Sequence, residues 1–278
     1  MKVSGKDVAE AILKKLQKKV EKLKVTPTLA IILAGEDPAS RMYVEFKIKA
    51  AKKIGVRIKF YKFLENQLED TLKTIEKLNA DKTIHGIIVQ YPIYKSWNFD
   101  DVFSRVAPQK DVDGFAKDSP FNGATAIGVW EMLTAFSFLE GFKSTKEFLK
   151  DKKIIVLGRG KTAGGPIIKL LGSYGLDITV VSRDTKNPQK VIKSADVVIS
   201  ATGVKNIINK TNLKKGSYVI GVGVGKEEVE GKQKVYGDIN EEDVAKIAKL
   251  YCPTIGGIGP LTIVSLLENT IEAAIMSS

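Results

Sequence analysis

The sequence predicts an α/β protein of two domains, each built around a parallel sheet. Apolar strand-like runs alternate with helical patterns through most of the chain, which is typical of parallel sheets covered by helices on both faces. The alternation falls into two series, separated at 110–128 by a stretch rich in Asp, Gly, Pro and Asn. The length of 278 residues also suits two domains of ordinary size.

The first series follows an amphipathic, lysine-rich helical pattern at 1–20, which lacks the uninterrupted apolar segment of a signal peptide. Three strand-like runs are separated by two helical patterns, so the series predicts a three-layer α/β domain. The strand-like runs are 28–35, 56–63 and 84–92, and the helical patterns are 40–56 and about 69–78.

The second series predicts a Rossmann-like domain. Its strand-like runs, again with helices between them, are 152–158, 177–183, 195–203 and 217–223. Because the connecting composition centres on 115–125, we place the first domain at 1–120 and the second at 121–261. A last helix, about 261–276, follows the glycine-rich stretch 253–262, and its pattern does not indicate which domain it joins.

Composition excludes several classes of protein. The net charge is +12, but the lysines are spread over many helices and interleaved with glutamates, which favours anionic small ligands over nucleic acid. No apolar run approaches the ~20 residues of a membrane span. A single cysteine, Cys252, excludes an internal disulfide and fits a reducing, cytoplasmic compartment. With one histidine, His85, a Cys/His zinc site is out of reach and we expect no metal; beside an apolar strand, this histidine reads as structural.

A glycine loop follows the first strand of the second series. Gly158, Gly160 and Gly164 are spaced G-x-G-x-x-x-G, and a helix is expected from about 163 to 174. Glycines permit a tight turn and close approach of the backbone, and a helix N-terminus supplies N–H donors to a pyrophosphate. The pattern therefore predicts a dinucleotide site, with a ligand-free turn as the alternative.

The next strand ends with residues that bear on the choice of dinucleotide. An NAD site usually has Asp or Glu here to bind the ribose 2′-hydroxyl, whereas this chain has Ser182 and Arg183. Arginine pairs with a 2′-phosphate, and Arg159 of the glycine loop could join it, so NADP is favoured over NAD. Asp184 is the residue that could reverse this preference.

Lys47 has an unusual place on its predicted helix. Val44, Ile48 and Ala51 form the apolar stripe, most charged residues lie opposite, and Lys47 falls at the margin of the stripe, one turn after Tyr43. A lysine in this position either extends its ammonium to water or has a function there.

Other polar residues of the first domain lie where ligands of open parallel sheets collect, beyond the carboxyl ends of the strands. Gln90 ends a strand, and Asp111 and Asp113 lie on the turn KDVDGF. Each has a structural alternative, such as capping a strand or shaping the turn. Together with Lys47 and Tyr43 they would present an ammonium, an amide, a phenol and a carboxylate, which suits a polar heterocycle.

Five stretches, in order and over nearly the whole chain, closely resemble the methylenetetrahydrofolate dehydrogenase/methenyltetrahydrofolate cyclohydrolase family. They are DPASRMYVEFKIKAAKKIGV, GIIVQYPI, PQKDVDGF, GRGKTAGGP and PTIGGIGPLTIVSLLENT.

The resemblance implies a set of site residues. The family's Tyr-Val-x-x-Lys pattern places its catalytic lysine on Lys47 and its tyrosine on Tyr43. The strand-end glutamine falls on Gln90, and the pterin-binding aspartate on Asp113. Gly257 and Pro260 would line the folate pocket.

The resemblance also implies a fold, a reaction and an assembly. The last helix, 262–278, would complete the first, folate-binding domain, and a cleft would separate it from the NADP-binding domain. The enzyme would be a homodimer that oxidises 5,10-methylenetetrahydrofolate with NADP+ and hydrolyses the methenyl product to 10-formyltetrahydrofolate. Lys47 would share protons with the attacking water while Gln90 orients it.

Three departures from the family pattern matter. The connector after Phe115 is shortened, and GATAIG (123–128) stands where the family has Pro-Cys-Thr-Pro-x-Gly. Gly160 stands where the family commonly has Ser, and Gly221 where it commonly has Asp. These bear on the hinge and on the cofactor contacts rather than on Lys47 and its neighbours.

Three other functions compete with this one. The first is a dehydrogenase of the same family without the hydrolase activity. The second is a two-domain oxidoreductase similar to shikimate dehydrogenase, which the DVDGF and GGIGPLT stretches do not suit. The third is a basic dinucleotide-binding regulator without catalysis, which has no need of the set around Lys47.

Overall fold

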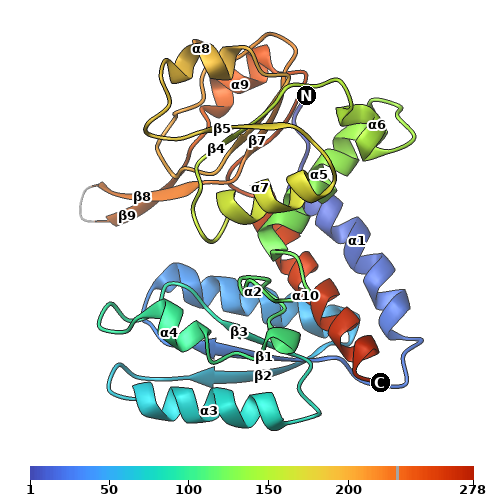
Figure 1. Ribbon diagram of the computed structural model, residues 1–278, viewed down its shortest axis with the longest axis vertical. Coiled ribbons are helices and arrows are strands. Elements are labelled where there is room, and N and C mark those ends of the chain that lie inside the picture. Colours follow the sequence, from blue (N-terminus) through green and yellow to red (C-terminus); the bar gives the residue numbers. More distant parts are fainter. Residues whose placement is uncertain (230–231) are drawn as a thin grey trace. The chain divides into compact units, whose positions relative to one another are not determined.

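The structure is a computed structural model that describes residues 1–229 and 232–278. It divides into two compact units. The N-terminal unit comprises 11–124 and 263–278, and the C-terminal unit comprises 1–10 and 125–262. Figure 1 labels their helices and strands, and each unit is described by itself.

The N-terminal unit contains a three-stranded parallel sheet. Its order is β2-β1-β3, so the chain leaves the central strand to one side and then returns to the other. The strands are β1 (Thr28–Leu33), β2 (Arg57–Lys62) and β3 (Gly86–Val89). Every residue of β1 and β3 is buried, as their continuous apolar runs predict for strands covered on both faces.

Helices cover the two faces of this sheet, with α2 on one side and α3 on the other (Figure 1). On the α3 side, Ala30 and Ile32 of β1 belong to one apolar cluster with Ile75 and Leu78 of α3. The helices are α2 (Pro38–Ile54), α3 (Leu68–Ala80) and the short α4 (Phe99–Phe103), with a 3₁₀ turn, η1, at Pro108–Lys110. This is the three-layer arrangement that the sequence predicts.

Local signals fix both ends of α2. The Asp37 carboxylate accepts the Ser40 N–H at 2.9 Å as an N-cap, and Pro38 occupies the first turn, where a missing N–H costs nothing. At the other end Gly55 adopts the left-handed conformation, with φ of 82°. The register of α2, and therefore the direction of each of its side chains, is set by these caps.

His85 is structural. The Thr28 N–H donates to His85 Nδ1 at 3.0 Å, between the starts of β1 and β3. Burial lowers the pKa of this histidine, and nearby Lys110 lowers it further. A neutral imidazole that accepts this bond needs no catalytic explanation.

The C-terminal unit contains a five-stranded parallel sheet of order β10-β7-β6-β4-β5. After β4 the chain forms β5 on one side and then β6 on the other, so the order reverses at β4. The strands are β4 (Ile154–Leu157), β5 (Ile178–Val181), β6 (Val197–Ser200), β7 (Tyr218–Gly221) and β10 (Leu250–Cys252). The helices are α5 (Ala124–Leu139), α6 (Thr145–Leu149), α7 (Gly164–Ser173), α8 (Pro188–Lys193) and α9 (Glu241–Ile247).

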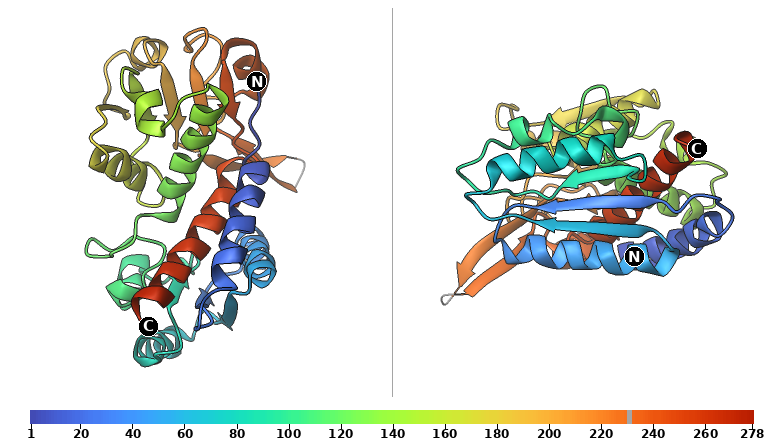
Figure 2. Two further views of the ribbon diagram at one scale, coloured as in Figure 1. Left: turned by 90° about the vertical axis from the view of Figure 1, so that its right-hand side faces the viewer. Right: turned by 90° about the horizontal axis from the view of Figure 1, so that it is seen from below.

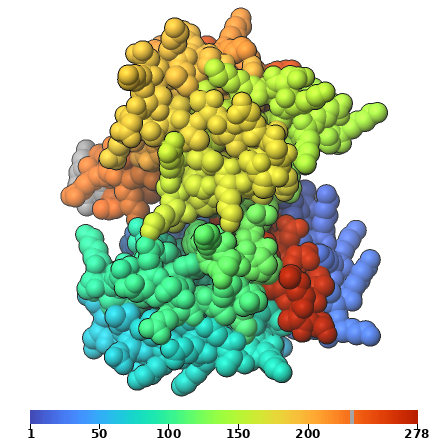
Figure 3. All heavy atoms as spheres, in the orientation of Figure 1, coloured from blue at the N-terminus to red at the C-terminus, as the bar shows by residue number. Residues whose placement is uncertain are grey.

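Two parts of this unit lie outside the sequence prediction. An antiparallel hairpin, β8 (Val224–Val229) with β9 (Lys232–Gly237), extends from the unit (orange in Figure 3). Val224, Val229 and Val235 of this hairpin are exposed. Residues 124–128, expected in a connecting loop, instead form the start of α5. There Ala124 and Ala126 are buried, and Gly128 packs against the backbone of Leu261, so tertiary packing overrides a loop-like composition.

Helices α1 (Gly5–Val20) and α10 (Ile258–Met276) lie side by side (Figure 2). Lys19 and Glu272 form an ion pair between them. Residues 1–10, expected in the first domain, belong to the C-terminal unit because Lys2 forms a β-bridge with Tyr251. Helix α10 begins three residues before its predicted start. By length and apolar composition it could cross a membrane, but 67% of the apolar window is buried, as in a core helix.

The two-domain α/β class with a Rossmann-like domain is confirmed. All seven strands named from the sequence are present, since continuous apolar runs bounded by turn residues gave a strong signal. The strands that the sequence did not predict, β8, β9 and β10, are polar, exposed or very short.

Candidate functional site

The N-terminal unit brings polar residues together at the carboxyl edge of its sheet, where the strand order reverses. Helix α2 leaves the end of β1, and Gln90 directly follows β3. The Gln90 N–H donates to the carbonyl of Ile32 at 2.8 Å, which places residue 90 at the end of the central pairing. In open parallel sheets this reversal point is where ligands bind.

Lys47 projects from α2 into this edge. The residue is only 6% exposed, and its Nζ donates a hydrogen bond to Gln90 Oε1 at 2.8 Å. Gln90 Nε2 donates in turn to the carbonyl of Tyr91 at 2.9 Å, which fixes the amide orientation. Burial lowers the pKa of Lys47, and the charge of Asp113 opposes this shift. The ammonium therefore does not extend to water, and its neutral form is more accessible than that of a surface lysine.

The two aspartates of the KDVDGF turn have different roles. Asp111 is 0% exposed, and its carboxylate accepts the N–H of Gly114 at 3.0 Å and of Ala116 at 2.8 Å. It shapes the turn. Asp113 is half-buried; burial raises its pKa, and the charge of Lys47 lowers it. Of the two aspartates, only Asp113 interacts electrostatically with Lys47. The structure therefore brings Lys47, Gln90 and Asp113 together.

Tyr43 lies one helical turn before Lys47 on α2 and is half-buried. Burial raises the pKa of its phenol, so the hydroxyl stays protonated near neutral pH and can donate a hydrogen bond. Its spacing from Lys47 places both side chains on one face of the helix.

Asn269 supports the site and was not singled out from the sequence. It is 6% exposed on α10, and its Nδ2 donates to the carbonyls of Val112 at 2.9 Å and Asn122 at 3.1 Å. These two bonds hold the backbone on which Asp113 sits. The asparagine lies within one of the stretches that carry the family resemblance, but nothing in its local pattern indicates a partner 157 residues away.

The C-terminal unit has its own ligand edge at β4, where its strand order reverses. Gly158 directly follows β4 and has a φ of 92°, and a Cβ there would lie 2.6 Å from the carbonyl oxygen of Ala201. A Cβ on Gly164 would collide with the carbonyl oxygen of Gly158, while nothing lies within 4 Å of a Cβ on Gly160. Two of the three glycines are thus required by close packing, and Gly160 leaves room for the serine common in the family.

Helix α7 starts at Gly164, directly after this loop, and no side chain caps its N-terminus. The positive end of the helix faces this loop and favours an anion, although the Gly165 N–H donates to the carbonyl of Gly160 at 3.0 Å and Pro166 has no N–H. Arg159 in the loop and Arg183 after β5 are exposed. The Ser182 N–H donates to Thr185 Oγ1 at 2.9 Å, closing a turn that carries Arg183 and Asp184. This donor set fits a dinucleotide that carries an additional phosphate.

Gly257 and Pro260, expected from the resemblance to line a folate pocket, belong to the C-terminal unit. Gly257 is buried, and a Cβ on it would collide with the carbonyl oxygen of Pro253. Packing therefore requires glycine at position 257. A folate contact for Gly257 or Pro260 stays a prediction.

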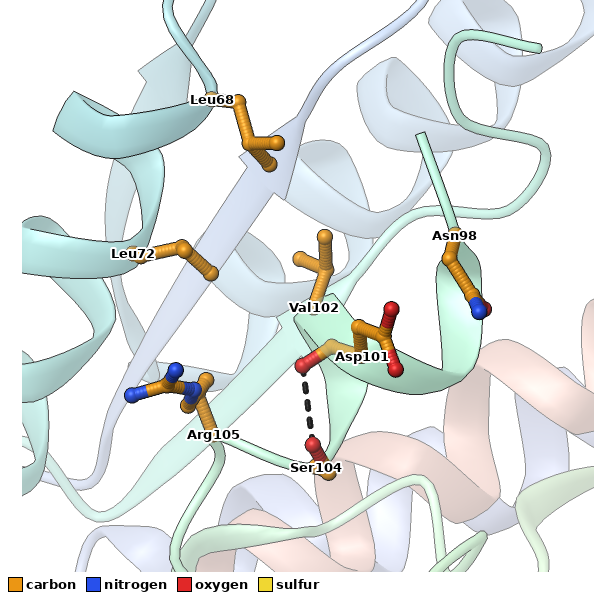
Figure 4. A pocket seen from close by; sticks show the side chains of 7 residues that line it. All are labelled: Leu68, Leu72, Asn98, Asp101, Val102, Ser104 and Arg105. Carbon is orange, nitrogen blue, oxygen red and sulfur yellow. Dashed lines mark hydrogen bonds between the residues drawn. The ribbon is translucent and has the colours of Figure 1, made fainter. Parts of the chain in front are cut away.

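A surface pocket of about 350 Å³ lies elsewhere in the N-terminal unit (Figure 4). Leu68 and Leu72 of α3 and Val102 of α4 form its apolar wall, and Arg105 lies at its polar rim and pairs with Glu76 at 3.4 Å. None of the predicted site residues lines it. Among residues 1–229 and 232–278, no group of three or more His, Cys, Asp or Glu could hold a metal ion.

A glycine-loop Rossmann unit, combined with a second parallel sheet that buries a lysine against an amide at its ligand edge, defines a dinucleotide-dependent α/β enzyme. Residues 3–113 match the catalytic domain of tetrahydrofolate dehydrogenase/cyclohydrolase, and residues 124–278 match the NAD(P)-binding domain of the same family. The chain belongs to this family.

Individual members of this family are similar to the chain over nearly its whole length. The bifunctional protein FolD of Geotalea daltonii is 37% identical over 98% of this chain and 98% of its own length. The structure of the bifunctional FolD enzyme of Campylobacter jejuni has a TM-score of 0.89 and 31% identity, covering 99% of both chains. The Trypanosoma brucei FolD structure, complexed with NADP cofactor and inhibitor, has a TM-score of 0.89 and 28% identity, covering 100% of this chain and 98% of that one.

Proposed function

We propose that this enzyme oxidises 5,10-methylenetetrahydrofolate with NADP+ to 5,10-methenyltetrahydrofolate, and hydrolyses that product to 10-formyltetrahydrofolate. The observation that carries the proposal is the buried Lys47, held 2.8 Å from Gln90 and coupled to Asp113 in the matched catalytic domain. A dehydrogenase that lacks the hydrolytic step is the alternative, and it would have no need of a buried lysine.

The hydrolytic step depends on proton transfer. Because burial lowers the pKa of Lys47, its neutral amine is more accessible than that of a surface lysine, and this amine can accept a proton from water and return it to the departing nitrogen. Gln90 holds Nζ in one place, so the amine is oriented before the substrate arrives. Tyr43, one helical turn before Lys47, would border the same site and donate a hydrogen bond there.

Asp113 is assigned to binding the pterin. A carboxylate accepts hydrogen bonds from two adjacent N–H groups, such as the amino and ring N–H of a pterin, in one plane. The two bonds from Asn269 fix the turn on which Asp113 sits. The substrate's one-carbon bridge would thereby lie against Lys47.

The dinucleotide supplies the hydride acceptor for the first step. Gly158, Gly160 and Gly164 would let its pyrophosphate approach the backbone at the start of α7, and Arg159, Ser182 and Arg183 would hold the 2′-phosphate end. Gly257 and Pro260 are assigned to the folate pocket by the family resemblance. The same resemblance supports assembly as a homodimer, and the single cysteine, Cys252, supports a cytoplasmic location.

The test is a spectrophotometric assay of the purified protein with methylenetetrahydrofolate and either NADP+ or NAD+. Reduced nicotinamide and the methenyl product are followed together. Reduction with NADP+ and little accumulation of methenyl product is expected. Reduction with accumulating methenyl product would favour the dehydrogenase-only alternative, and no reduction with either cofactor would contradict the proposal.

A further inference from the structure

Asp238 has no part in the sites described above, yet it lies at the ligand edge of the five-stranded sheet. It follows β9 directly, and the next residue, Ile239, forms a β-bridge with Ile208. Asp238 is 0% exposed. Burying a carboxylate is costly unless hydrogen-bond donors surround it. The donors around Asp238 therefore identify the segments that it holds in place.

The Asp238 carboxylate joins the loops that follow three neighbouring strands. Its Oδ2 accepts the N–H of Thr202, after β6, at 3.2 Å, and the N–H of Gly223, after β7, at 3.1 Å. Its Oδ1 accepts the hydroxyl of Thr254, after β10, at 3.2 Å. Since the sheet order is β10-β7-β6, these loops are adjacent at the carboxyl edge.

Two glycines pack closely around this carboxylate and its threonine partner. A Cβ on Gly223 would collide with Asp238 Oδ2, and a Cβ on Gly221 would collide with Thr254 Oγ1. Position 221 is where the family pattern has Asp. In this chain the Thr254 hydroxyl fills that space and donates to Asp238, which explains how a glycine is accommodated there.

The loop that Asp238 holds also contacts the glycine loop. Ala201, the residue before Thr202, donates its N–H to the carbonyl of Leu157 at 2.9 Å, and its own carbonyl oxygen would lie only 2.6 Å from a Cβ on Gly158. Arg183, after β5, is assigned to the 2′-phosphate end of the dinucleotide, and the pyrophosphate to the loop after β4. The nicotinamide end must then extend in the opposite direction along the sheet edge, toward β6 and β7.

We propose that Asp238 and Thr254 are positioning residues for the nicotinamide half of the dinucleotide. They fix the loops 201–203 and 222–223 in the shape that this half requires, without touching the cofactor. The inference rests on the dinucleotide part of the proposed function and is independent of the folate chemistry.

The experiment measures dissociation constants of NADPH and of 2′,5′-ADP, which carries the 2′-phosphate but no nicotinamide. Asp238→Asn and Thr254→Val, which removes only the hydroxyl, are expected to weaken NADPH binding about tenfold and to leave 2′,5′-ADP within about twofold. Thr254→Ser keeps the hydroxyl and should bind NADPH as the wild type does, even if it is less stable.

Asp196→Asn is the matched control at the opposite, amino end of β6. Asp196 also accepts a backbone N–H, from Lys153 at 2.9 Å, and pairs with Lys214 at 2.6 Å. It should lose stability but keep both dissociation constants. Equal weakening of both ligands in Asp238→Asn, unchanged NADPH binding in Thr254→Val, or equal loss in Thr254→Ser and Thr254→Val would overturn the inference. Failure of the wild type to bind NADPH would overturn the cofactor assignment as well. Absence of folate turnover alone would contradict the proposed folate chemistry but would not change the meaning of these dissociation constants.

Discussion

Lys47 Nζ lies 2.8 Å from Gln90 Oε1, at the reversal point of the N-terminal sheet. The two residues come from different elements, and neither side chain has freedom to turn away: Lys47 is buried, and Gln90 also donates to the carbonyl of Tyr91. An amine held in this way can accept and return a proton at a defined point.

The pH dependence of hydrolysis should report on this contact. Burial lowers the pKa of Lys47, so the rate should rise with pH along a limb that lies below the usual 10.5 of lysine. Gln90→Glu places a carboxylate beside Nζ, stabilises the ammonium and should move the limb to higher pH, with at least a tenfold loss near pH 7.5. The measurement is a pH–rate profile of methenyltetrahydrofolate hydrolysis for both proteins, with the dehydrogenase rate as control. An unmoved limb in the variant would show that Lys47 is not the titrating group.

Cofactor preference should depend on Arg183. Arg183→Ser removes the guanidinium assigned to the 2′-phosphate and should raise the KM for NADP+ by about 10- to 100-fold, with little change for NAD+. Steady-state kinetics with both cofactors measure this. Asp184→Ser, at the neighbouring exposed position, is the control; if it instead changes the use of NAD+ while Arg183→Ser changes nothing, the assignment is reversed.

Asn269 should affect folate binding without affecting the dinucleotide. Asn269→Ala removes the two hydrogen bonds that hold the backbone beside Asp113 and should cost about 1–3 kcal/mol of unfolding free energy. The KM for the folate should rise several-fold while the dissociation constant of NADPH stays the same. Ser277→Ala, just past the end of the same helix, should change neither. An unchanged KM in Asn269→Ala would reduce this residue to a purely structural role.

Asp238 gives a stability prediction with a definite sign. Burial raises its pKa to about 6 from 3.8, although its hydrogen-bond donors oppose the shift. A raised carboxylate pKa means that folding favours the protonated form, so its contribution is full below about pH 4 and is lost as the pH rises through 6. Relative to Asp238→Asn, the wild type should therefore gain up to about 3 kcal/mol between pH 8 and pH 4. Urea unfolding of both proteins at several pH values measures the difference; a difference that is constant or falls toward acid pH contradicts the assignment.

Parts of the fold and site were predictable because their signals are local. The apolar stripe of α2 placed Lys47 at a buried margin, and the residue is 6% exposed. Continuous apolar runs identified the strands that are buried on both faces, and the glycine spacing after a strand identified the loop at Gly158.

Other parts depend on contacts that no local pattern encodes. Asn269 and Asp238 act by hydrogen bonds to loop backbones and to a distant hydroxyl, and any asparagine or aspartate in a sequence could do the same. The start of α5 has the composition of a loop, and only burial of Ala124 and Ala126 makes it helical. The resemblance to a family supplied the roles of Lys47 and Asp113, which composition and spacing left open.

The most direct test of the central claim is to replace Lys47 and follow both reactions. Lys47→Met keeps a long apolar side chain but removes the amine, and Lys49→Met makes the same change at an exposed position of the same helix. With methylenetetrahydrofolate and NADP+, Lys47→Met should remain folded, bind NADPH, and form no 10-formyltetrahydrofolate above the uncatalysed rate, while Lys49→Met should match the wild type. Normal hydrolysis in Lys47→Met would contradict the account.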